Sequence, residues 1–308
     1  MAKARRSKII RDCLRLADSL SDESGFLPVR SLADHFSIEV VFRPLLVEAM
    51  LASVPASNEA RPKWLVLVDS DRFPKGQMDF ENETADQPLP GRLRNTIAHE
   101  ILHSLSFRAN ESDFEFRMER HAGEKQEDFV NRIERETEDL SPLLLIPEKC
   151  LLRLARGSRT TFRSILELQR NCAATRDVLV NRLRIWMRDD TSGSLYGGGV
   201  ENIGLGIGCW EAGKAYFIDR PVYANFRNNH LPHLFTQLAS QKKLSVLQVT
   251  GDLGFVLNGG AETTITIDGH RNGEFLDYLK MRIRLSVEPK AASRNGKFLF
   301  FVEKLPES

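Results

Sequence analysis

The sequence lacks the features that mark several specialised classes of protein. Its 308 residues include only four cysteines, Cys13, Cys150, Cys172 and Cys209, which lie far apart without a CxxC pair. This spacing argues against a disulfide framework and against a cysteine-rich zinc site. The chain has no run of 18 apolar residues, and its basic, amphipathic start has neither the apolar core nor the cleavage site of a signal peptide. We therefore expect a cytoplasmic protein with buried free thiols and no membrane partner.

The sequence also lacks an excess of charge of either sign. Lys and Arg total 43 against 42 Asp and Glu, for a formal net charge of +1. This balance gives no reason to expect a general polyanion binder, although local basic patches remain possible. With 42% hydrophobic and 28% charged residues, the composition is that of a globular protein with a sizeable core. The length predicts two domains, or one catalytic domain with an appended module.

Hydrophobic periodicity in the first half of the chain predicts both helices and strands. Between residues 7 and 36, apolar residues recur at helical spacing with a break at SDESGFLP, which indicates two short helices. The predicted strands are Ile38–Leu46 and Trp64–Val68, and residues 69–91 are polar and rich in Pro and Gly, as in a loop. Arg92–Phe107 carries Ile97, Ile101, Leu102 and Leu105 at helical spacing and is predicted to be a mostly buried helix.

In the second half of the chain, the sequence pattern changes from one that predicts helices to one that predicts strands. Phe162–Met187 is predicted to form two helices around a turn near residues 171–175, and the Gly-rich segment at residues 192–199 is the clearest linker. Beyond it we predict five strands: Ala215–Ile218, Leu244–Val249, Thr263–Ile267, Met281–Val287 and Lys297–Val302. The fold class expected from the whole pattern is α+β, with the main domain boundary at the linker.

One motif in the buried helix carries chemistry. His99-Glu100-Ile101-Leu102-His103 is an HExxH motif. Histidines four residues apart lie on one face of a helix, so that both imidazoles can bind one metal ion. Glu100 then lies close enough to hold an activated water molecule and accept its proton as the catalytic base. The alternative is a pair of hydrogen-bonded histidines on a buried helix, which would bury three polar groups without an evident partner.

A catalytic metal site of this kind needs a third protein ligand and an open position for water. The candidates are four carboxylates on one predicted helix: Glu134, Glu136, Glu138 and Asp139. Glu134 and Glu138 lie on the same side of that helix, an arrangement suited to one carboxylate on the metal and a second that orients a histidine N–H. Helix geometry leaves the choice open, with a modest preference for Glu134.

The motif and its surroundings resemble the ImmA/IrrE family of metallopeptidases. The resemblance lies in R-x-R-N-T-I-A-H-E-I-L-H, from Arg92 to His103, and in a Glu-rich helix some thirty residues later that ends in Leu-Leu-Ile-Pro. Setting Leu144–Pro147 against the family's LLMP motif places Glu134 at the position of the glutamate ligand. The sequence departs from the family at Thr137 and Glu138, where Ala and Asn are usual, and at Pro142 inside the stretch.

The resemblance implies a domain order. It gives a mainly helical, gluzincin-like zinc-metallopeptidase domain with a short N-terminal sheet at residues 1–150. A helix–turn–helix-like helical extension at 151–191 and a strand-rich α/β, GAF-like sensor domain at 200–308 would follow.

The resemblance also implies an activity. The protein would be a cytoplasmic endopeptidase that cleaves a helix–turn–helix transcriptional repressor, relieving repression of stress, DNA-damage or phage-defence genes. One Zn²⁺ ion is the expected cofactor, and a His/His/Glu ligand set also permits Mn²⁺. Single-stranded DNA or another single-stranded nucleic acid, a small molecule and a protein partner are the candidate activators at the C-terminal domain, and the composition does not choose among them.

Two other functions compete with this interpretation. One is a DNA-binding regulator with a structural metal site, in which Arg176, Arg182, Arg184 and Arg188 contact phosphates. The other is a ligand-gated sensor whose output is the peptidase. Cys150, close behind Pro147, could also approach the metal as a thiolate, although a buried structural cysteine is the simpler interpretation.

Overall fold

A computed structural model of the chain describes residues 2–55, 63–107, 120–156 and 162–188, together with strands between residues 203 and 304. The fold is α+β, as the sequence predicted. The chain divides into two compact units, residues 1–153 with 166–182, and residues 154–165 with 183–308. The HExxH helix belongs to the first unit.

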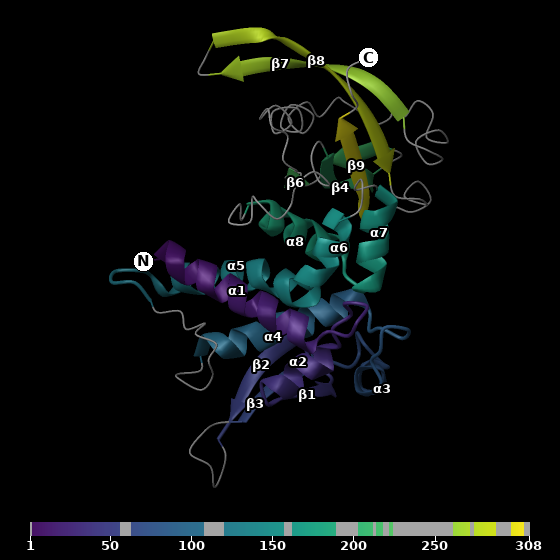
Figure 1. Cartoon of the computed structure of the whole chain (residues 1–308). Helices are drawn as coiled ribbons and strands as arrows, with labels where there is room; N and C mark the ends of the chain where they lie inside the picture. Colours follow the sequence, from purple (N-terminus) through teal and green to yellow (C-terminus); the bar gives the residue numbers. More distant parts are fainter. Residues whose placement is uncertain are drawn as a thin grey trace. The chain divides into compact units, whose positions relative to one another are not determined.

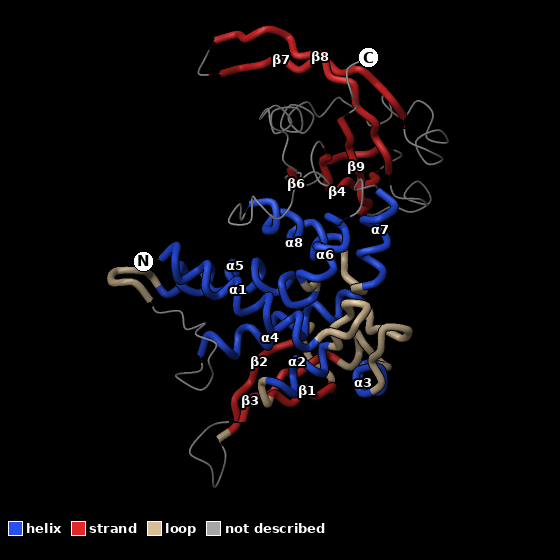
Figure 2. Tube along the Cα trace, viewed as in Figure 1, coloured by secondary structure: helices blue, strands red, loops and turns tan. Residues whose placement is uncertain are grey.

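The first unit combines a small sheet with several helices (Figures 1 and 2). Its strands are β1 (Ile38–Arg43), β2 (Ala49–Val54) and β3 (Lys63–Asp69). Its helices are α1 (Ala2–Leu20), α2 (Val29–His35), α3 (Gly76–Glu81), α4 (Gly91–Phe107) and α5 (Gln126–Leu145), with most of α6 (Glu148–Arg156), α7 (Phe162–Asn171) and α8 (Arg176–Arg188).

The small sheet has the strand order β1-β3-β2. Strand β3 pairs in parallel with β1 and antiparallel with β2, so β2 lies at an edge. The predicted strand from Ile38 ends at Arg43 rather than Leu46, because Pro44 supplies no backbone N–H to a sheet. The second predicted strand is confirmed as β3, whereas β2 was not predicted. The expected loop at residues 69–91 also contains the short helix α3.

Helix α4 is the predicted buried helix, and it lies between the sheet and α5 (Figure 1). Leu93, Ile97, Ile101 and Leu105 recur every four residues along it, and each is at most 2% exposed. Burial of such a stripe, at roughly 1.5–3 kcal/mol for each large aliphatic side chain, fixes which way the helix faces. Two other faces of α4 are thereby directed at β2 and α5.

A buried ion pair anchors the first half of α4. The side chains of Arg94 and Glu83 are both 0% exposed and form a charge-assisted hydrogen bond. Arg94 Nη2 also donates to the carbonyl oxygen of Leu27 at 2.7 Å, and its guanidinium lies 4.3 Å from the ring centroid of Phe26. The other oxygen of Glu83 accepts the N–H of Val29 at 2.7 Å, where α2 begins. Arg94 therefore ties α4 to the chain that leads into α2.

Helix α5 packs against α4 and α1 through a stripe of buried residues. Ile133, Thr137, Leu140 and Leu144 lie on this stripe. The helix continues past Pro142, whose carbonyl oxygen accepts the N–H of Ile146 at 3.0 Å. Ser141 Oγ donates to Asn95 Oδ1 at 3.2 Å and so sets the position of α5 along α4.

Helices α7 and α8 confirm the two helices predicted around residues 171–175. The turn between them meets the start of α4 so closely that a Cβ at Gly91 would lie 2.8 Å from the carbonyl oxygen of Ala173. A side chain at position 91, where α4 begins, would collide with this turn, so the position requires glycine.

The second unit contains an antiparallel sheet of order β5-β4-β9-β8-β7, with β6 paired to β4. Its strands are β4 (Ile203–Glu211), β5 (Lys214–Phe217), β6 (Val222–Tyr223), β7 (Ala261–Arg271), β8 (Glu274–Val287) and β9 (Lys297–Lys304). Four of the five predicted strands overlap β5, β7, β8 and β9, and Leu244–Val249 lies outside the described residues. Within the described residues, no helix combines the length and apolar character needed to span a membrane.

Candidate metal centre

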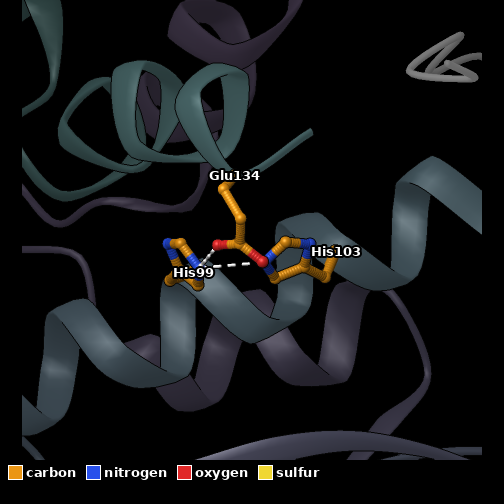
Figure 3. Close-up of side chains that lie close together, drawn as sticks. All are labelled: His99, His103 and Glu134. Atoms are coloured by element: carbon orange, nitrogen blue, oxygen red, sulfur yellow. Dashed lines mark hydrogen bonds and ion pairs between the residues drawn. The ribbon is translucent and has the colours of Figure 1, made fainter. Parts of the chain in front are cut away.

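The two histidines of the HExxH motif face the same point from successive turns of α4. Their Nε2 atoms are 2.9 Å apart and their ring centroids 4.5 Å apart (Figure 3). Burial and the neighbouring His103 lower the pKa of His99 below its ordinary value. His99 is therefore neutral at neutral pH, which is the form of imidazole that binds a metal ion.

Glu134 of α5 completes the group from across the helix–helix interface. Its Oε2 lies 3.2 Å from His99 Nε2, and its Oε1 lies 3.3 Å from His103 Nε2 (Figure 3). These three residues form a group of donor atoms, all within 4.8 Å of one another, that could hold a metal ion. The sequence left the choice of carboxylate open, and the packing of α5 brings Glu134 to the histidines.

The donor set fits zinc in both chemistry and spacing. Ligand atoms bound at 2.0–2.1 Å in a tetrahedral site are roughly 3.3 Å apart. The three separations of 2.9, 3.2 and 3.3 Å between the donor atoms are close to this value. Glu134 is 47% exposed, whereas the side chains of His99 and His103 are 19% and 11% exposed. The group is thus held by the core on the histidine side and open to solvent beside the carboxylate, which leaves room for a fourth ligand.

Glu100 lies next to this group and is held by the edge strand. The backbone N–H of Leu51 in β2 lies close to its carboxylate. Burial, followed by the negative charge of Glu134, raises the pKa of Glu100 to about 7, against the effect of this N–H, which favours the charged form and acts to lower the pKa. A carboxylate with this pKa exchanges protons near neutral pH, as a general base must.

The remaining predicted ligands and contacts occupy other positions. Glu138 is exposed on α5 and is not part of the donor group, so its position is not that of a buried partner for a histidine. Glu136 and Asp139 also lie outside the group. Cys150 is 6% exposed, and its Sγ lies 3.6 Å from the carbonyl oxygen of Gly25, so the thiol is buried, as one of the two interpretations expected.

The DNA-binding alternative loses one of its phosphate contacts. Arg182 is only 1% exposed, and its Nε donates to the carbonyl oxygen of Ile146 at 2.9 Å. The prediction that it contacts a DNA phosphate is therefore wrong. Arg176 is partly exposed, and the side chains of Arg184 and Arg188 lie outside the described residues.

Sequence reasoning missed the residues that connect β2 to α4. Glu48 contacts Arg92 and Thr96 of α4, and Leu51 contacts Glu100. The arginine at the start of the motif was only a weak signal for an acidic partner, because Arg92 is 71% exposed and water can also satisfy an exposed guanidinium. No pattern in the sequence identified which acidic residue that would be.

Comparison with known proteins places the chain in no family. No family model matches it, and no curated protein matches it. Among solved structures, it is similar to a Mycobacterium tuberculosis transcriptional regulator. The identity is 11% and the TM-score 0.45, over 98% of this chain and 78% of the other.

Proposed function

We propose that this protein is a zinc-dependent endopeptidase of the ImmA/IrrE type, and that its substrate is a helix–turn–helix transcriptional repressor. The observation that carries the proposal is the convergence of His99, His103 and Glu134 on one point, with Glu100 beside them on the same helix. A His/His/Glu group with an adjacent carboxylate and an open side suits peptide hydrolysis better than a closed structural site.

Each residue of the group has a defined part in this reaction. His99, His103 and Glu134 would hold the metal ion. Bound there, zinc would supply Lewis acidity that polarises the scissile carbonyl and lowers the pKa of water. Glu100 accepts a proton from the attacking water and returns it to the leaving nitrogen. Manganese is the second choice of metal, since imidazole and carboxylate ligands also accept it.

The edge strand offers a surface along which a substrate segment can lie. In the described part of the sheet, β2 pairs with β3 along one side only. An extended peptide can add to such an edge through main-chain hydrogen bonds. Since Leu51 of β2 also contacts Glu100, a peptide on this edge would pass close to the proposed base.

The second unit supports a regulatory part of the proposal. Its antiparallel sheet is compatible with a sensor module, and we propose that it receives the activating signal as a GAF-like domain in the cytoplasm. Single-stranded DNA and a small molecule are the two activators to test. Loss of Arg182 as a phosphate contact makes DNA binding through α8 the weaker alternative.

The proposal is tested by co-expression with helix–turn–helix proteins encoded beside this gene. We expect the wild type to cleave one of them, and Glu100→Gln to retain zinc but to reduce cleavage by at least about a hundredfold, within the range that general-base catalysis contributes. Glu138→Gln, which changes an exposed carboxylate of α5, is the matched control and should cleave normally. Undiminished cleavage by zinc-loaded Glu100→Gln would show that Glu100 is not the base.

A further inference from the structure

Glu48, in the turn before β2, has a carboxylate that is held entirely by side chains of neighbouring elements. Its Oε1 accepts hydrogen bonds from Arg92 Nε at 2.9 Å and from Thr96 Oγ1 at 2.8 Å. Its Oε2 accepts a hydrogen bond from Arg92 Nη2 and lies 3.5 Å from Arg72 Nη1. These bonds lower the pKa of Glu48 despite its partial burial, so that it is ionised at neutral pH.

The contacts of Glu48 lie on the same face of α4 as Glu100. Arg92, Thr96 and Glu100 are spaced four residues apart, so they follow one another along one side of the helix. Strand β2 runs beside this face. It is tied there at two points, at Glu48 through Arg92 and Thr96, and at Leu51 through the carboxylate of Glu100.

The strand needs such a tie because of its place in the sheet. As the edge strand, β2 has only β3 beside it among the described strands, and all six of its residues are partly exposed or exposed. The backbone bond from Asp69 N–H to Glu48 O, at 2.9 Å, fixes the start of β2 against β3 but not against α4. The contact between the start of β2 and α4 is supplied by the side chain of Glu48.

We infer that Glu48 is a positioning residue, which holds β2 against α4 so that the Leu51 N–H stays on the carboxylate of Glu100. The inference deepens the proposed function, because it concerns the same base, and it rests on that function wherever cleavage is the measurement. A backbone donor kept at the carboxylate of Glu100 restrains how that side chain points, and its orientation matters for proton transfer. An ion pair as exposed as this one, with Arg92 71% exposed, contributes little to stability. Its main effect is therefore on the position of the strand.

The test compares Glu48→Ala, Glu48→Gln and Glu39→Gln in the full, zinc-loaded chain. Glu39 pairs with Lys63 across β1 and β3, so Glu39→Gln removes an ion pair from the same sheet, away from α4. Glutamine at position 48 keeps one oxygen for Arg92 and Thr96 and should rescue part of the alanine defect. The measurements are amide hydrogen exchange at Leu51, bound zinc, and kcat and KM on the repressor found by co-expression.

We expect Glu48→Ala to speed exchange at the Leu51 amide by about tenfold or more and to leave bound zinc unchanged. It should lower kcat by about tenfold to a hundredfold with KM within about twofold, since part of the general-base contribution is lost. Glu48→Gln should fall between alanine and wild type, and Glu39→Gln should match wild type.

Unchanged exchange at Leu51 in Glu48→Ala would overturn the inference, and so would a wild-type kcat in a chain whose Leu51 amide has been released. If the wild type cleaves no repressor, the proposed function fails, while the exchange measurement still decides whether Glu48 holds the strand.

Discussion

Replacing Arg94 by Met should destabilise the first unit by about 4 kcal/mol. The substitution leaves the carboxylate of Glu83 fully buried without its counter-charge, which in proteins costs about 3–5 kcal/mol. The bond to the Leu27 carbonyl and the contact with Phe26 are lost at the same site, and methionine recovers part of the apolar packing. Since domains are stable by only about 5–15 kcal/mol, this loss should lower the unfolding midpoint markedly.

The measurement is urea unfolding followed by the fluorescence of Trp64 in β3, with Trp186 and Trp210 replaced by Phe so that only the first unit reports. Restricting the signal to one unit keeps the two-state treatment valid for that unit. Arg92→Met is the matched control, two residues away and 71% exposed, and should cost less than about 1 kcal/mol.

A double variant tests whether the uncompensated charge of Glu83 causes the loss of stability in Arg94→Met. Arg94→Met with Glu83→Gln removes the uncompensated charge, while the glutamine oxygen can still accept the Val29 N–H. We expect the double variant to regain at least about 2 kcal/mol relative to Arg94→Met alone. Equal stability of the single and double variants, or a loss below about 1 kcal/mol in the single variant, would refute the buried-charge argument.

Two further outcomes are expected. Glu134→Gln should lower the affinity for zinc by about a hundredfold or more in competition with a chelator, because it removes the anionic ligand, whereas Glu138→Gln should bind zinc as the wild type does. If Glu138→Gln causes the larger loss, the ligand assignment is wrong. Gly25→Ala should cost about 3 kcal/mol in the same unfolding assay, since Gly25 has a φ of +90° and its new Cβ would overlap Cys150 Sγ. A cost below about 1 kcal/mol would show that the turn and the thiol move apart easily.

The helix that carries the histidines could be predicted because its signal is local. Ile97, Ile101 and Leu105 share one side at a spacing of four, and the histidines share another side for the same reason. A helical repeat of 3.6 residues fixes these relations without any tertiary contact. The expected pairing of His99 and His103 therefore required only the helix, and the structure contains it.

The third ligand could not be chosen from the sequence because it depends on how two helices meet. Glu134 and Glu138 occupy neighbouring turns of one side of α5, so a shift of one turn exchanges them. The contact between Ser141 and Asn95, together with the burial of Ile133 and Leu140, sets the register in which Glu134 reaches the histidines. Such contacts join residues more than forty positions apart, and a single sequence does not pair them.

Strand β2 was missed for a related reason. AMLASV has neither the alternation nor the β-branched enrichment that identifies a strand. Its conformation comes from pairing with β3 and from the contacts of Glu48 and Leu51 with α4. Arg94 shows the same limit for burial, because its charge suggests an exposed residue until Glu83 is known to be its partner.

The three faces of α4 are held in different ways, which predicts how the candidate site responds to a bound substrate segment. One face is closed by Leu93, Ile97 and Ile101 in the core, and the face with the histidines meets α5. The first is held by apolar packing, which admits little displacement, and the second by the buried stripe of α5 together with the polar contacts of Asn95 and the two histidines. The third face, with Glu100, meets an edge strand through polar contacts that are partly open to solvent. A substrate segment that pairs with β2 would press on this third face alone. Substrate binding should therefore change the surroundings of Glu100 while the donor group of His99, His103 and Glu134 stays in place.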